Sequence, residues 1–205
     1  MATWKEWKRG DIIFGIIVPC VVAFLIVIFP MELAPILRDI DPSGALNSIF
    51  VDGLGEAILI VGVPMFLGLL WNQWVGGASG FLLGSVYALY ANDAFAAAGA
   101  WTESMMIGDI SNLGFVVCAM LTGYIAGALN RGSYSFRRMV IAGLVSGIIG
   151  GLFLLWTGII SPLGMVTDIP YVAFIIFLPR VIYGVIMPIF ATVFGWYGIT
   201  PRQMS

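Results

Sequence analysis

The sequence contains no histidine, and this absence excludes several kinds of chemistry. Haem held by two histidines, histidine-ligated copper and histidine proton relays are all excluded. Lysine occurs only as Lys5 and Lys8, outside the apolar segments, so a retinal Schiff base inside a helical bundle is excluded as well. No glycine-rich loop followed by Lys-Ser or Lys-Thr is present, so the chain has no such loop with which to drive itself by ATP.

Cysteine is also scarce, with only Cys20 and Cys118, and each lies within an apolar run. Two cysteines without histidine or clustered acids make a poor metal site, and lone buried cysteines mostly behave as small hydrophobic residues. Nothing in the sequence resembles a catalytic triad. We therefore predict that the protein is not an enzyme, and we expect no metal, no cofactor and no nucleic-acid partner.

Charge is the third shortage, because only 10% of the 205 residues are charged while 60% are hydrophobic. A soluble domain has about 25% charged residues, so this composition could not cover a water-exposed surface. The mean hydropathy is +1.03, and apolar stretches of membrane-spanning length recur along the chain. Each is long enough to cross the hydrocarbon core of a bilayer, which is about 30 Å thick. The sequence predicts a polytopic integral membrane protein.

We predict an all-α bundle of six transmembrane helices that forms a single domain over residues 1–205. Turn-forming residues separate most of the helices, among them Asn92-Asp93 and Asn130-Arg131-Gly132-Ser133. The weakest break is Trp71-Asn72-Gln73-Trp74, where one long kinked helix is the alternative. The predicted spans are about 12–30, 53–71, 75–91, 111–130, 138–160 and 170–197.

The distribution of basic residues predicts the orientation. If both termini are cytoplasmic, a single basic residue, Arg38, falls in an outer loop, and most acidic residues fall on the outer side. Such an excess of lysine and arginine marks the cytoplasmic side of a membrane protein. We therefore expect both termini inside, in a plasma membrane of the prokaryotic type. The basic residues on the inner side are Lys5, Lys8, Arg9, Arg131, Arg137, Arg138 and Arg202.

Three predicted spans carry glycines four residues apart, which places these glycines on one face of each helix. Helices in lipid associate through close backbone approach, and small residues allow it. One interpretation is tight packing inside a compact bundle. The other is a partner-helix interface that docks or slides against another membrane subunit. The glycines are Gly76, Gly80 and Gly84 in the third span, Gly123 and Gly127 in the fourth, and Gly143, Gly147 and Gly151 in the fifth.

Arg180 lies between Pro179 and Pro188, about ten residues into the last predicted span. Charges at this depth cost several kcal/mol and normally face an interior cavity or a partner. Arg180 could pair with Glu56, or cap carbonyls that the prolines leave without donors. Alternatively, it could close the floor of an outward-facing solute pocket, or contact another subunit.

Polar and aromatic residues surround the outer mouth of the predicted bundle. The segment 92–110 is rich in alanine and glycine, and it could fold over a ligand as a lid. An ordinary interfacial loop with solvated acids is the alternative. With Arg180 and Glu56, the candidate ligand-binding residues are Trp101, Glu103, Asp109, Asn112, Asp168 and Tyr171.

Three stretches, residues 63–84, 113–132 and 178–189, carry a resemblance to a known family. They are similar to the substrate-binding S components of energy-coupling factor vitamin transporters. Residues 63–84 resemble the family's proline, short turn and glycine-rich third helix. Residues 113–132 resemble its fourth helix, and residues 178–189 the last helix of its folate- and pantothenate-type members. The likeness extends over about residues 50–197.

The resemblance implies a specific mechanism. An S component captures a vitamin-like solute from outside, under a lid of outer loops. It then topples in the membrane against a coupling subunit that two cytoplasmic ATPases power. Arg180 and the mouth residues would hold the solute. The family commonly carries an alanine face on the first helix for that subunit, and this chain has Gly15, Pro19 and Ala23 at the same spacing.

We therefore expect the membrane-embedded binding component of a vitamin or small-solute uptake transporter, with the lipid bilayer, a coupling subunit and a solute as its partners. One alternative is an accessory or structural subunit of a larger membrane complex. Another is a small channel or ion-coupled carrier that uses Glu56 and Arg180.

Overall fold

The computed structural model describes residues 12–18, 20–21, 36, 39–41, 57–97, 110–161 and 168–197. All the regular secondary structure in this part of the chain is helical, which confirms the predicted all-α class for it. The elements are the π-helical segments η2 (Ile13–Ile17) and η4 (Ala57–Gly62), and the α-helices α5 (Val63–Leu70), α6 (Gln73–Ala97), α7 (Ile110–Asn130), α8 (Phe136–Ile160) and α9 (Ile169–Trp196).

Three helices are long and apolar enough to cross a membrane: α7 from Asn112 onward, α8 and α9. The 25 residues of α8 and the 28 of α9 give lengths of about 37 Å and 42 Å at 1.5 Å per residue. The apolar helix Ala57–Leu70, formed by η4 and α5, is shorter. These helices support the prediction of a membrane protein.

Large apolar side chains cover the outer surfaces of α8 and α9. Trp156 on α8 and Phe174 on α9 are more than half exposed, and isoleucines and valines surround them. Soluble monomers rarely expose contiguous apolar patches larger than a few hundred Å². The two helices therefore have the surface that a hydrocarbon environment favours.

The break between the second and third predicted spans is present. Helix α5 ends at Leu70 and α6 begins at Gln73. The side chain of Asn72 caps α6, because its Oδ1 accepts hydrogen bonds from the backbone N–H groups of Trp74 and Val75, both at 2.9 Å. Two helices joined by a capped turn therefore replace the alternative of one kinked helix.

The predicted turn at Asn92-Asp93 is wrong. Helix α6 continues through both residues to Ala97, so the first six residues of the proposed lid segment 92–110 are helical. Asparagine and aspartate cost a helix less than about 1 kcal/mol each, and the alanines around them are the best helix formers. Residues 98–109 lie outside the described residues.

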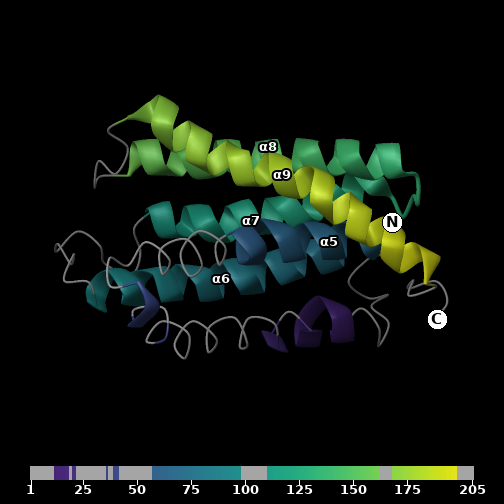
Figure 1. Ribbon diagram of the computed structural model, residues 1–205, viewed down its shortest axis with the longest axis horizontal. Helices are drawn as coiled ribbons and strands as arrows, with labels where there is room; N and C mark the ends of the chain where they lie inside the picture. Colours follow the sequence, from purple (N-terminus) through teal and green to yellow (C-terminus); the bar gives the residue numbers. More distant parts are fainter. Residues whose placement is uncertain are drawn as a thin grey trace.

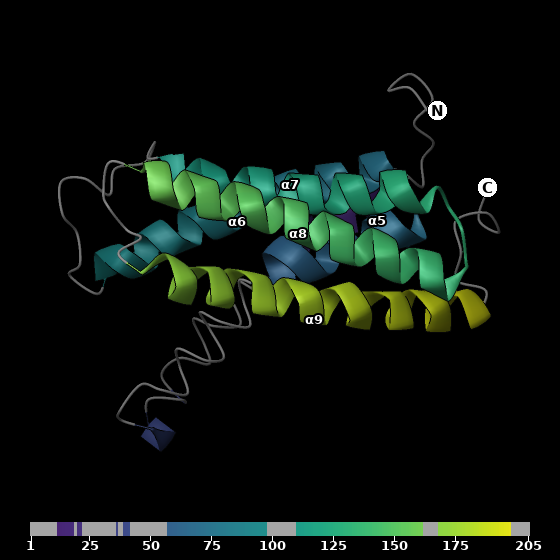
Figure 2. The ribbon, with the colours of Figure 1, turned by 90° about the horizontal axis from the view of Figure 1, so that it is seen from above.

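The helices lie side by side along one long axis (Figure 1). From α6 to α9, each helix packs on the next one in the chain, while α5 also contacts α7 and α9. The view from above shows α9 along one side of the bundle, beside α8 (Figure 2). The buried core is formed mainly by residues of η4, α5, α6 and α7.

Helices α6 and α7 meet at their backbones. A Cβ added at Gly76 would overlap the carbonyl oxygen of Gly123, and one added at Gly123 would overlap the carbonyl oxygen of Gly76. A Cβ at Gly80 would overlap the carbonyl of Ala119, and one at Gly84 would lie 2.8 Å from the Cα of Val116. The glycine face of α6 therefore packs against α7 of the same chain.

Helices α8 and α9 use the same device. A Cβ at Gly143 would lie 2.7 Å from the carbonyl oxygen of Gly184. Pro188 has no N–H to donate to that oxygen, so the intrahelical bond that a helix would normally form there is missing. Gly147 and Gly151 lie against Arg180. The glycine face of α8 therefore also packs inside this chain, and Gly143 contacts the carbonyl that Pro188 leaves without its usual donor.

Gly123→Ala should destabilise the protein by about 1–3 kcal/mol, because the new methyl group has no space between α6 and α7. Thermal unfolding of the purified protein in detergent measures this. The matched control is Gly195→Ala in α9, where an added Cβ would make an ordinary 3.6 Å contact with the ring of Tyr134. An equal effect of the two substitutions would contradict the tight packing.

Candidate functional site

Arg180 is only 1% exposed, and it is the largest fully buried side chain of the described residues. Its Nη1 donates a hydrogen bond to the carbonyl of Ile176, one turn earlier in α9. Its Nη2 lies 3.4 Å from the sulfur of Cys118 on α7. The guanidinium therefore connects α9 with α7 in the core of the bundle.

Glycines of α8 make room for this arginine. A Cβ at Gly151 would lie 2.9 Å from the Cδ of Arg180, and one at Gly147 would lie 3.1 Å from its carbonyl oxygen. The neighbouring Gly150 leaves space for Thr122, whose buried hydroxyl has no hydrogen-bond partner in the part of the chain described. Arg180, Cys118 and Thr122 therefore form a polar cluster within the bundle.

The contact with Ile176 belongs to the turn of α9 that Pro179 disrupts. Pro179 has no N–H for the carbonyl four residues before it, and Arg180 donates to the next carbonyl along the helix. That carbonyl is not one that Pro179 or Pro188 leaves without its usual donor, so the predicted capping of such carbonyls by Arg180 stays a prediction. Glu56, the other predicted partner, lies outside the described residues.

The structure describes three of the remaining candidates, namely Asp168, Tyr171 and Asn112. Asp168 is the N-cap of α9, where its Oδ1 accepts a hydrogen bond from the N–H of Tyr171 at 3.2 Å. Tyr171 is 63% exposed, and it precedes Arg180 by two and a half helical turns, which places it on the opposite face of α9. Asn112 lies in the first turn of α7. Trp101, Glu103 and Asp109 lie outside the described residues.

Of the residues predicted to face a partner, the six glycines of α6 and α8 contact helices of this chain, as described above. Gly15 lies in η2. Pro19 and Ala23 lie outside the described residues, so their predicted role on the first helix stays a prediction.

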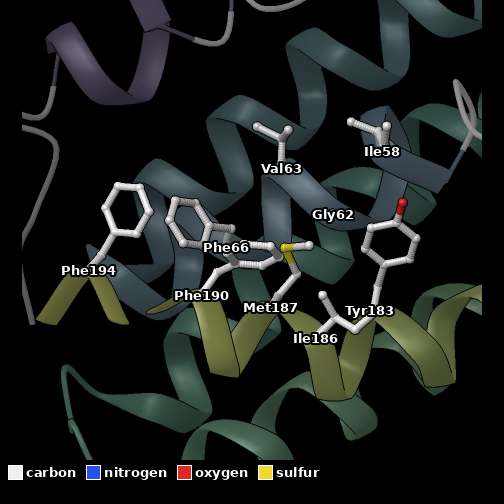
Figure 3. Close-up of a pocket in the computed structure, with 9 residues that line it drawn as sticks. All are labelled: Ile58, Gly62, Val63, Phe66, Tyr183, Ile186, Met187, Phe190 and Phe194. Carbon is white, nitrogen blue, oxygen red and sulfur yellow. The ribbon is translucent and has the colours of Figure 1, made fainter. Parts of the chain in front are cut away.

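A groove of about 510 Å³ lies between the helix 57–70 and α9 (Figure 3). The face of α9 nearest to it is adjacent to the face that carries Arg180, and Arg180 does not line the groove. The lining residues are Ile58, Gly62, Val63 and Phe66 from η4 and α5, and Tyr183, Ile186, Met187, Phe190 and Phe194 from α9.

The groove is apolar along its length, with a single hydroxyl at one end. The rings of Phe66 and Phe194 meet edge to face with centroids 5.2 Å apart. At the other end, the ring of Tyr183 lies against Gly62, where an added Cβ would be 3.0 Å from the ring. The oxygen of Tyr183 points toward the segment that carries Ile58 (Figure 3). The groove therefore suits a mainly apolar molecule that carries one hydrogen-bonding group.

Sequence reasoning missed this groove. Its α9 residues recur at the spacing of one helical face, from Tyr183 through Phe190 to Phe194. That pattern was visible, but the lipid-facing residues of α9 have the same apolar character. Comparison of the chain with protein-family models, curated proteins and solved structures gave no match.

Arg180→Ala should lower the free energy of unfolding by about 2–4 kcal/mol, because it leaves a cavity and removes the donors to Ile176 and Cys118. The control is Arg137→Ala, which removes an exposed arginine and should change stability by less than about 0.5 kcal/mol. Thermal unfolding in detergent compares the two. If both variants were as stable as the wild type, Arg180 would have no structural role.

Proposed function

We propose that this protein is the solute-binding membrane subunit of an uptake transporter of the energy-coupling factor type. The groove between the helix 57–70 and α9 would hold the apolar part of the solute. The single observation that carries this proposal is the groove itself, because five of its nine lining residues fall in two of the segments that resemble the S components.

The size and the lining of the groove support this function. Small-molecule sites are commonly clefts of about 300–1,000 Å³, lined by apolar and aromatic side chains with few polar groups. The groove has about 510 Å³ and contains aromatic rings, a thioether and the hydroxyl of Tyr183. This chemistry favours an uncharged end of the solute in the groove, with Tyr183 as its hydrogen-bonding partner.

The proposal includes six membrane-spanning helices with both termini in the cytoplasm. The arginines at the α7–α8 turn support this orientation, because they lie at the end of the bundle opposite Asp168. The internal packing of both glycine faces supports a bundle that reorients as one rigid body against its coupling subunit.

The accessory-subunit alternative loses part of its support. It relied on glycine faces that contact neighbouring proteins. In the described residues, the glycine face of α6 contacts α7 and that of α8 contacts α9. An accessory subunit would also need no groove for a solute. No observation on the described residues specifically favours a channel or carrier that uses Glu56 and Arg180.

Native mass spectrometry of protein gently extracted from its own membrane tests the proposal. We expect the 22.1 kDa chain with a bound small organic molecule. Val63→Trp should lose that molecule, because the indole fills the groove. Val185→Trp is the matched control, since Val185 is exposed and lies on the side of α9 that faces away from the groove.

Either of two results would overturn the assignment. One is a fixed assembly with other subunits and no small-molecule adduct. The other is an adduct that survives Val63→Trp in a correctly folded protein, which would place the solute elsewhere.

Tyr183→Phe should weaken solute binding about five- to tenfold, which corresponds to the loss of one hydrogen bond of about 1 kcal/mol. Unfolding of the unliganded protein should be nearly unchanged, since the ring and its contact with Gly62 remain. Titration of the solute identified in the adduct into both proteins gives the ratio of the dissociation constants. Equal constants would show that the hydroxyl makes no contact with the solute.

A further inference from the structure

One end of the bundle concentrates positive charge and aromatic rings. The turn from α7 to α8 contains Arg131, with φ of 51°, and Gly132, with φ of 68°, a conformation that few residues other than glycine adopt easily. Arg137 and Arg138 follow in the first turn of α8. Tyr134 and Trp196 are exposed at the same end, where Gly195 of α9 approaches Tyr134.

The acidic residues of the described helices lie at the other end. Asp168 caps the start of α9, whose last turn lies beside Tyr134. Asp93 belongs to the last turns of α6, and the first residue of that helix, Gln73, lies against Gly127 near the end of α7. The arginines of the α7–α8 turn therefore lie at the end of the bundle opposite Asp93 and Asp168.

A second groove, of about 310 Å³, opens beside these arginines. Its polar lining is Ser135, Arg137 and Arg138, and its apolar lining is Leu129, Ile141 and Ala142. The Nε of Arg138 donates a hydrogen bond to the carbonyl of Leu129 at 3.0 Å, which fixes the guanidinium beside the groove.

The groove is separate from the one proposed for the solute, and it has a different character. One side carries two full positive charges, while the other side continues onto the exposed apolar surface of α8 at Ile141. The first turn of α8 contains no acidic residue that would reduce this charge. This lining fits an occupant that combines an anionic group with a hydrocarbon chain.

We propose that this groove binds an anionic phospholipid of the surrounding bilayer. The phosphate would lie between Arg137 and Arg138, and an acyl chain would follow Ile141 and Ala142 along α8. Charge complementarity selects the anion, and the apolar half of the lining selects a lipid over a soluble phosphate. Exposed tyrosine and tryptophan at this end favour the headgroup level of a membrane, where such a lipid is available.

The full-length protein in detergent is mixed with equal amounts of phosphatidylglycerol and phosphatidylcholine that carry the same acyl chains. Native mass spectrometry then counts the lipids that stay bound. We expect a preference for phosphatidylglycerol, and Arg137→Gln should reduce it about fivefold, the value for one arginine near an anionic surface. The matched control is Arg131→Gln, which removes one charge from the same turn but does not line the groove; it should change the preference less than twofold.

Any one of several results would overturn the proposal. The wild type could show no preference for the anionic lipid, or the two variants could lose it equally, which would indicate diffuse attraction only. Glycerol phosphate could displace the lipid at equal concentration, which would indicate a site for soluble anions. If Arg137→Gln failed to fold, thermal unfolding of the wild type would decide. A saturable rise of the wild-type unfolding temperature with phosphatidylglycerol, but not with phosphatidylcholine, would support the site. An equal rise of that temperature with both lipids would refute it.

Discussion

Close contact between helix backbones is the constraint on which the rest of this fold depends. In a hydrocarbon environment, helices gain little from burying apolar side chains, because lipid tails are just as apolar. Association must come from van der Waals packing and from polar contacts between the helices. The pairs Gly76–Gly123 and Gly143–Gly184 supply the packing, because any larger side chain there would push the axes apart.

The position of Arg180 follows from that packing. Its stem fits only because Gly147 and Gly151 leave space on α8, and its guanidinium then reaches Cys118 on α7. The adjacent face of α9, which carries Tyr183 and Phe190, lies opposite η4 and α5. Along most of this face, no glycine of η4 or α5 leaves comparable space. There, Phe66 of α5 and Phe190 of α9 line the apolar groove between the two helices. One helix thus carries a closed polar core on one face and an open apolar groove on the next.

The sequence predicts the helices well where an apolar run ends in clear turn chemistry. The predicted span 138–160 is α8 (Phe136–Ile160), because Gly132 and Ser161 bound it. The extension of α6 past Asn92-Asp93 could not be predicted, since weak helix breakers yield to the alanines around them. Residues outside the described part of the chain, such as Glu56, are not tested, and their roles stay predictions.

The candidate site was predictable only in part, because contacts across the bundle leave no local pattern. Arg180 stands out as a charge in an apolar run, but Cys118, 62 residues earlier, gives no sign that it meets a guanidinium. The groove is a property of the spacing between two helices, and its residues have the same character as those that face lipid. Periodicity identifies a helical face, whereas a pocket depends on what lies opposite that face.

A double-mutant cycle between Gly76→Ala and Gly123→Ala tests the central constraint most directly. We predict that the double variant is destabilised by at least about 1 kcal/mol less than the sum of the two single variants, because the first methyl group already separates α6 from α7. Gly123→Ala combined with Gly143→Ala should be additive, since these glycines belong to different interfaces. Additive free energies of unfolding for Gly76 and Gly123 would contradict a shared backbone contact at the centre of this fold.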